Sequence, residues 1–120
     1  MRHSRAYIII GLLTVLLLVS CGQQYQAKSL VKDFVKEHAT EEIDITSFSD
    51  LDSTKVIGDS LLQAIRQRAL SDPLFKDVQL PPVPAHTTLL FIRMRYGEDS
   101  LNLSKTFYFT PDLEAIVAFK

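Results

Sequence analysis

The sequence predicts an α+β fold in which two helices pack on one face of a three- or four-stranded antiparallel sheet with a C-terminal β-meander. Apolar residues recur at helical spacing within residues 27–35 and 60–70, and apolar stretches at 88–96 and 101–109 flank a short turn typical of a hairpin. The chain of 120 residues has no internal repeat, so we expect one domain over residues 27–120.

Residues 1–20 have the organisation of a secretory signal peptide. A basic start is followed by an uncharged apolar run over residues 6–19. Such a run would form a helix of about 21 Å, whereas the hydrocarbon core of a bilayer is about 30 Å thick. A cleaved signal therefore fits better than the alternative, an uncleaved anchor.

The end of this run, Leu18-Val19-Ser20-Cys21, resembles the lipobox of bacterial lipoproteins. A small residue before the cysteine gives the signal peptidase access to the bond, and the thiol accepts a lipid as a thioether. We therefore expect lipidation at Cys21, a lipidated tether over residues 21–26, and a membrane partner for the acyl chains. Gly22 stands where an aspartate would retain such proteins in the inner membrane, which favours the outer membrane. Residues 23–26 lack the acidic cluster of surface export, which favours its periplasmic face.

The expected mature chain, residues 21–120, carries eleven Lys and Arg against 14 Asp and Glu, a net charge of −3. This balance argues against nucleic acid as a partner.

The elements follow from periodicity. The first helix has one apolar stripe, formed by Ala27, Leu30, Val31, Phe34 and Val35. Residues 43–49 alternate as a short strand, and residues 49–53 form a turn.

In the second helix, residues 60–70, Ser60 and Gln63 have capping-box spacing. One face of this helix carries Leu61, Ala64, Ile65 and Arg68. Asp72-Pro73 ends that helix, and the prolines of residues 80–84 make a stiff connector.

The hairpin register places Gly97 opposite Ser100, so that Met94 opposes Leu103 and Leu90 opposes Phe107. The inner face then carries Leu90, Ile92, Met94, Leu103, Phe107, Phe109 and Ile116. The outer face carries Leu89, Phe91, Arg93, Arg95, Ser104, Thr106, Tyr108, Val117 and Phe119.

This outer face is the candidate ligand or partner site, with Phe91, Arg93, Arg95, Thr106 and Tyr108 as its binding residues. Arginines beside aromatic rings can clamp an anion or stack on a sugar or peptide. The alternative is that a loop covers the apolar residues while the arginines are solvated.

No catalytic or metal-binding set accompanies this face, and we expect no cofactor. Residues 50–54 begin like a calcium loop, but Lys55 stands where the turn glycine belongs. His38 with Glu41 or Glu42 offers too few ligands for zinc, and His38 and His86 are the only histidines of the mature chain.

Three segments, residues 30–37, 47–54 and 107–113, resemble a group of small lipoproteins of Bacteroides-like bacteria. The resemblance implies a fold of helices and a β-meander and supplies no functional residues. The sequence therefore favours a non-enzymatic envelope lipoprotein that binds an envelope protein or acts as an accessory module. The alternatives are a hydrolase acting on envelope polymers and a purely structural membrane-proximal domain.

Lipidation is directly testable. Mass spectrometry of the protein purified from membranes should find Cys21 acylated and no unmodified peptide that spans Ser20 and Cys21, because cleavage and acylation consume that bond and that thiol. Cys21→Ala should remain unacylated, and an unmodified spanning peptide in the natural protein would contradict the lipobox.

Overall fold

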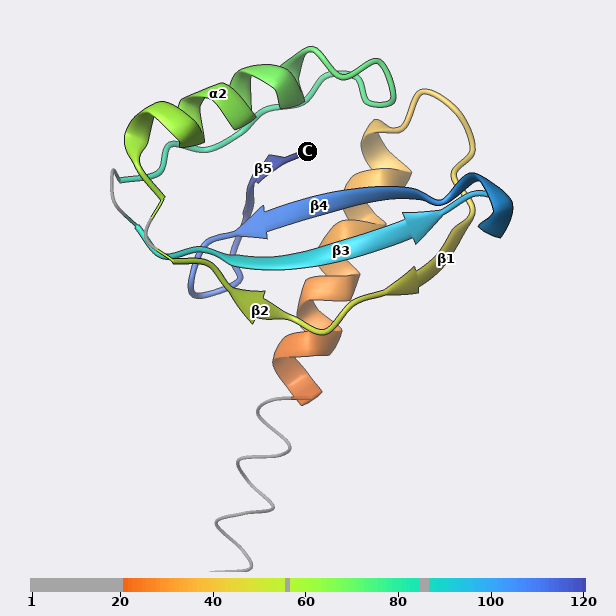
Figure 1. The fold of residues 1–120 in the computed structure, drawn as a ribbon, viewed down its shortest axis with the longest axis horizontal. Helices are drawn as coiled ribbons and strands as arrows, with labels where there is room; N and C mark the ends of the chain where they lie inside the picture. Colours follow the sequence, from red (N-terminus) through yellow and green to blue (C-terminus); the bar gives the residue numbers. More distant parts are fainter. Residues whose placement is uncertain (1–20, 56, 85–86) are drawn as a thin grey trace, which may run out of the picture.

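The computed structural model describes residues 21–55, 57–84 and 87–120 (Figure 1). A helix covers residues 21–38 and is followed by β1 (Ile45–Phe48), β2 (Asp52–Ser53), α2 (Asp59–Leu70), β3 (Leu90–Tyr96), the short 3₁₀ helix η1 (Asp99–Leu101), β4 (Leu103–Phe109) and β5 (Ile116–Phe119). The strands form one antiparallel sheet in the order β1-β3-β4-β5, with β2 also paired to β3. The α+β class is confirmed. The sheet has a fifth strand because Asp52 and Ser53, expected in a turn, pair with β3.

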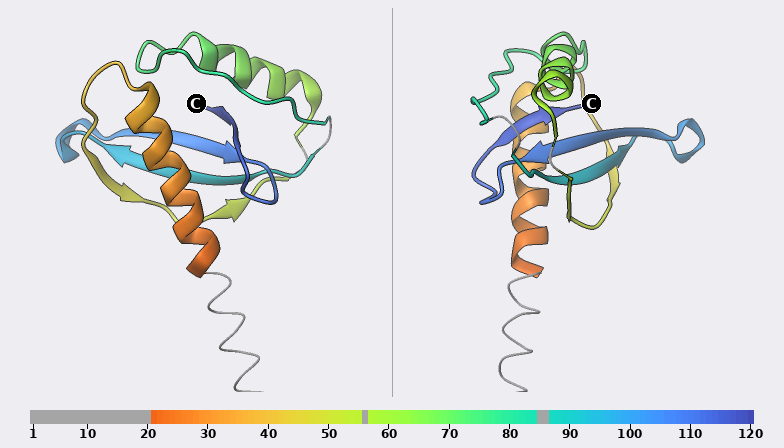
Figure 2. Two further views of the ribbon diagram at one scale, coloured as in Figure 1. Left: turned by 180° about the vertical axis from the view of Figure 1, so that it is seen from behind. Right: turned by 60° about the vertical axis from the view of Figure 1, so that its left-hand side comes forward.

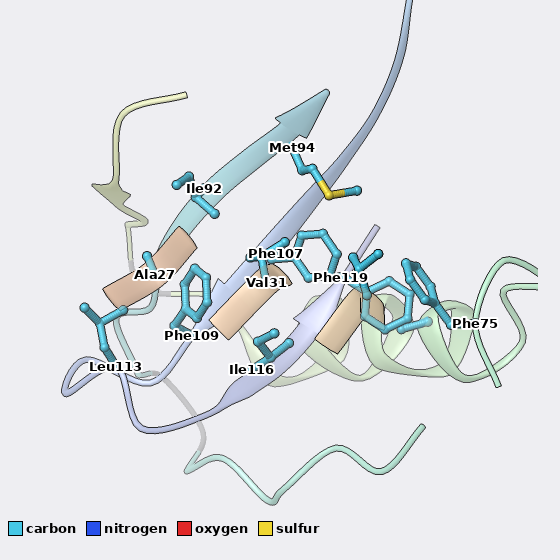
Figure 3. Packing of buried hydrophobic residues seen from close by; sticks show 12 residues of the cluster. Ala27, Val31, Phe75, Ile92, Met94, Phe107, Phe109, Leu113, Ile116 and Phe119 are labelled. Carbon is cyan, nitrogen blue, oxygen red and sulfur yellow. The ribbon is translucent and has the colours of Figure 1, made fainter. Parts of the chain in front are cut away.

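The N-terminal helix, residues 21–38, covers the inner face of the sheet with the predicted stripe. Ala27 and Val31 are fully buried and Val35 is 6% exposed. They pack in one cluster with Ile92, Met94, Phe107, Phe109 and Phe119 (Figure 3). Burial of this stripe, rather than helix propensity, holds the helix in place.

Residues 21–26, expected to form the lipidated tether, are helical and continuous with the helix of residues 27–38. Two side chains of this segment hydrogen-bond to backbone groups of the sheet and its turns. Gln24 donates from Nε2 to the Ser49 carbonyl at 2.9 Å and accepts from the Leu51 N–H at 2.6 Å. Gln26 donates to the Leu113 carbonyl at 3.2 Å. The helix therefore begins its contacts with the sheet within four residues of Cys21.

The two helices do not share one face of the sheet. Leu62 and Ile65 of α2 pack with Leu89, Tyr108 and Val117 on the outer face, whereas Ala69 near its end reaches the inner cluster. Helix α2 thus crosses the β5 side of the sheet (Figure 2). Beyond its end, Asp72 forms an ion pair with Lys105 of β4.

Arg66 of α2 holds the helix against β5 and the proline connector. Its Nη1 donates to the carbonyls of Val117 at 2.8 Å and Pro81 at 2.7 Å, and its Nη2 donates to the Leu80 carbonyl at 3.2 Å. One guanidinium thereby joins α2, β5 and the proline connector, and such charge-assisted hydrogen bonds are stronger than neutral ones.

The hairpin differs from the predicted register by two residues. Leu90 pairs with Phe109, Ile92 with Phe107, and Tyr96 with Leu103. The connection is longer than a four-residue turn because Gly97 and Asn102 take positive φ angles on either side of η1. A shift of two residues keeps every side chain on its predicted face, although Leu103 is displaced to the exposed end of the strand.

Phe119 lies in the inner cluster, not on the outer face as predicted. The pairing of β4 with β5 shifts between Tyr108 and Phe109, so Val117 and Ala118 both belong to the outer cluster. This irregularity restores Phe119 to the inner face, and sequence alternation alone does not reveal it.

Residues 1–20, where the signal peptide is predicted, lie outside the described residues. Within the described ranges no helix has the length and hydrophobicity that crossing a membrane requires.

The buried face of α2 also differs from the prediction. The helix begins after Gly58 with no side-chain cap, so the expected Ser60–Gln63 capping box is absent, and Leu62, Ile65 and Ala69 are buried while Leu61 is 59% exposed. The predicted face and the buried face both have helical spacing, and the helix adopts the orientation that keeps Arg68 out of the core.

This neighbouring leucine pair gives a matched test of the packing. Leu62→Ala should lower the free energy of unfolding by about 2–5 kcal/mol because it leaves a cavity in the outer cluster. Leu61→Ala should change it by less than about 0.5 kcal/mol, since its side chain is largely in solvent. Chemical denaturation of both variants measures the difference, and equal losses would contradict the orientation of α2.

Candidate functional site

The apolar half of the predicted outer face is covered. Leu89 and Val117 are fully buried and Tyr108 is 7% exposed, because α2 packs over them with Val83 of the proline connector. Phe91 is half-buried at the margin of this cluster, with its ring centroid 6.2 Å from that of Tyr108. For these residues the structure agrees with the alternative in which another segment covers them, and Tyr108 serves chiefly in packing.

The polar half of the same face is open. Arg93 and Arg95 are both exposed and two residues apart on β3, so they lie on one side of the strand about 7 Å from each other. Hydroxyl side chains flank them, since Thr106 pairs with Arg93, and Ser104 and Ser47 lie on either side of Arg95. The structure therefore brings Arg93, Arg95 and Thr106 together, whereas Tyr108, two residues from Thr106 on the same side of β4, is buried under α2.

Neither arginine is paired with an acid among the side chains that the structure describes, since none of their carboxylate oxygens lies within 4.0 Å of either guanidinium. Arg95 donates from Nη2 to Asn102 Oδ1 at 2.8 Å, a neutral partner that orients the guanidinium without neutralising it. Paired guanidinium groups of this kind bind carboxylate, sulfate or phosphate oxygens.

The other candidate ligands serve local structure. His38 has Nδ1 2.9 Å from the Lys76 carbonyl and its ring 4.7 Å from that of Phe34. Asp52 accepts from the Ser53 N–H in β2. Within the described part of the chain, no three His, Cys, Asp or Glu side chains converge as a metal site would require. His86 lies outside the described residues.

A groove that the sequence did not predict runs along one side of the N-terminal helix. Three adjoining cavities of about 430, 430 and 300 Å³ form it. The first begins at Cys21 and shares Lys28 with the second, and the second shares Lys32 and Ile45 with the third. All four residues of β1 line the central cavity, so the groove follows that edge strand.

A row of lysines forms the helical wall of this groove. Lys28, Lys32 and Lys36 are spaced by four residues and so project from one side of the helix. The Nζ atoms of Lys28 and Lys32 lie 6.0 and 5.9 Å from the ring centroid of Phe48 in β1. The four-residue spacing was visible in the sequence, but on its own it is typical of a solvated helix face.

The turn between β4 and β5 supports the Cys21 end of the helix. The Thr110 hydroxyl donates to Asp112 Oδ1 at 2.6 Å, and the Glu114 N–H donates to the same oxygen at 3.2 Å. These hydrogen bonds hold the pKa of Asp112 below its ordinary value of 3.8. The turn presents the Leu113 carbonyl to Gln26, with Leu113 at a φ of 57°.

Comparison with profiles of known protein families, with curated proteins and with solved structures finds no match to this chain. The function must therefore be argued from the geometry of these two surfaces.

The Asp112 contact predicts a pH effect. Because its pKa is lowered in the folded state, its stabilising contribution is present above 3.8 and is lost as the pH falls through the lower folded-state value. Thr110→Val should move the NMR titration midpoint of the Asp112 carboxyl up toward 3.8, whereas Thr110→Ser, which keeps the hydroxyl, should not. An unchanged midpoint in Thr110→Val would show that the hydroxyl is not the main cause.

Proposed function

We propose that this chain is a lipid-anchored, non-enzymatic protein of the bacterial cell envelope that binds an acidic envelope partner through the open half of the outer sheet face. The observation that carries the proposal is the pair of exposed arginines, Arg93 and Arg95, with no carboxylate within 4.0 Å among the described side chains. Two such cations side by side create a local positive potential on a chain of net negative charge.

The neighbouring groups suit recognition of a carboxylate-bearing polypeptide. Each guanidinium can donate two parallel hydrogen bonds to one carboxylate, and Thr106 and Ser104 offer hydroxyl groups beside them. Phe91, half-buried at the margin, supplies the adjacent apolar contact. The binding residues of this proposal are therefore Phe91, Arg93, Arg95 and Thr106, and Tyr108 acts beneath them by packing against Phe91.

The anchor in this proposal is the acyl group expected on Cys21. The N-terminal helix would then join the lipid directly to the core of the protein, since Gln24 and Gln26 already contact the sheet and its turns. Val31 lies ten residues beyond the cysteine, about 15 Å along a helix axis, so the protein would stay close to the bilayer.

Crosslinking in intact cells tests the proposal. Arg93→Ala with Arg95→Ala should reduce the yield of a specific crosslinked envelope protein about tenfold or more, because both charge-assisted contacts are lost. The matched control is Lys55→Ala with Lys76→Ala, which removes the same charge from two other exposed positions and should leave the yield unchanged. The complexes are purified from the membrane fraction and identified by mass spectrometry.

Measuring the free energy of unfolding should show whether a lost partner reflects lost binding contacts or a destabilised fold. Both arginines are exposed, so the double variant should unfold within about 0.5 kcal/mol of the natural protein. If the same partners are recovered from the Arg93→Ala, Arg95→Ala protein, the proposed binding face is wrong.

A further inference from the structure

We infer that the groove between β1 and the N-terminal helix is a docking site for an extended acidic polypeptide segment, which adds to the sheet as a further strand beside β1. This site lies at the β1 edge of the sheet and is not lined by Arg93 or Arg95, so either proposal can fail without the other.

The first argument is the edge of the sheet. Strand β1 pairs with β3 on one side, and within the described residues it has no strand on its other side. Backbone donors and acceptors along such an edge pair readily with an added extended chain. The central cavity, about 430 Å³, lies against all four residues of β1 and so leaves room for that chain.

The second argument is that the backbone of residues 49–51, next to β1, is hydrogen-bonded by a side chain of the helix. At residues 49–51 the Gln24 side-chain amide donates to the Ser49 carbonyl and accepts from the Leu51 N–H. One side chain thus supplies the donor and acceptor that a neighbouring strand would supply. Next to this amide, the edge of β1 borders the open cavity instead.

The third argument is charge and spacing. Lys28 and Lys32 stand over β1 on the opposite wall of the groove, and they are separated by about 6 Å along the helix axis. Alternate residues of an extended chain are about 6.7 Å apart and point to the same side. Two acidic side chains at alternate positions of an added strand would therefore match the two lysines.

The acids of the groove lie toward its two ends. Asp50 lines the first cavity, and Glu41 and Glu42 line the third beside Lys36. The cationic segment is consequently the central one, beside β1. A polypeptide satisfies both walls of that segment, because its backbone pairs with the strand edge while its acids meet the lysines. An anionic lipid headgroup would satisfy the lysines alone.

The test uses the full lipidated protein purified in neutral detergent and a fluorescent peptide in which Glu alternates with Val. Binding is measured by fluorescence anisotropy, and amide hydrogen exchange of residues 45–48 reports where the peptide lies. We expect binding, slower exchange in β1, and a dissociation constant raised about fivefold or more by Lys28→Gln with Lys32→Gln. The control, Lys55→Gln with Lys76→Gln, should bind like the natural protein.

Two altered peptides examine the two walls separately. Replacing Glu by Lys should abolish binding through the loss of charge complementarity, and N-methylation of alternate backbone nitrogens should abolish it through the loss of strand pairing. The inference is overturned if the N-methylated peptide binds equally well, if the acidic peptide does not bind, or if exchange at residues 45–48 is unchanged. Anionic phospholipid vesicles that displace the peptide and slow β1 exchange themselves would identify the groove as a membrane contact instead.

Discussion

The burial of one helical stripe, Ala27, Val31 and Val35, determines most of this structure. Full burial of a valine side chain stabilises a fold by about 1.5–3 kcal/mol, and these residues also exclude water from Phe107 and Phe119. The N-terminal helix therefore cannot leave the sheet without exposing the aromatic centre of the core. Because the same helix contains Cys21, a lipid on that residue would be held in a fixed orientation relative to the sheet.

The two edges of the sheet differ in how they are covered. The β5 edge contributes to packing, whereas the β1 edge is the candidate docking site. The β5 side is covered by α2, where Arg66 donates to the outward Val117 carbonyl and leaves little for another chain to bind. At the opposite edge, the described residues place the Gln24 amide at residues 49–51 and the Asp52 carboxylate at the Ser53 N–H, and neither is a covering helix. An open edge strand can pair with other chains and cause aggregation unless it is short or charged. Strand β1 has four residues and lies below two lysines, so unspecific pairing is limited and an acidic segment is favoured.

The sequence predicted the buried face correctly wherever the spacing of apolar residues allowed only one arrangement. The stripe of the first helix and the two faces of the hairpin were predicted correctly, the latter despite a register error, because a shift of two residues preserves alternation. The prediction failed where two solutions fitted one period, as for Leu61 and Leu62, or where a bulge interrupted the alternation, as before Phe119. The exposure of Arg93 and Arg95 was likewise predictable from alternation. The lysine groove was not, because it depends on which sheet edge the helix approaches.

The geometry also restricts where a partner in the groove can come from. With the acyl chains that the lipobox predicts on Cys21, Lys32 would stand eleven residues along a helix from the lipid, about 16 Å. That distance places Lys32 about 8–11 Å above the polar headgroup layer, which is about 5–8 Å thick on each side of the hydrocarbon core. A segment bound beside β1 would therefore lie next to the bilayer, so its source would be a protein already held at the membrane. Tethering both partners to one surface raises their effective concentration, and a groove with only four strand residues and two lysines can then suffice for stable association.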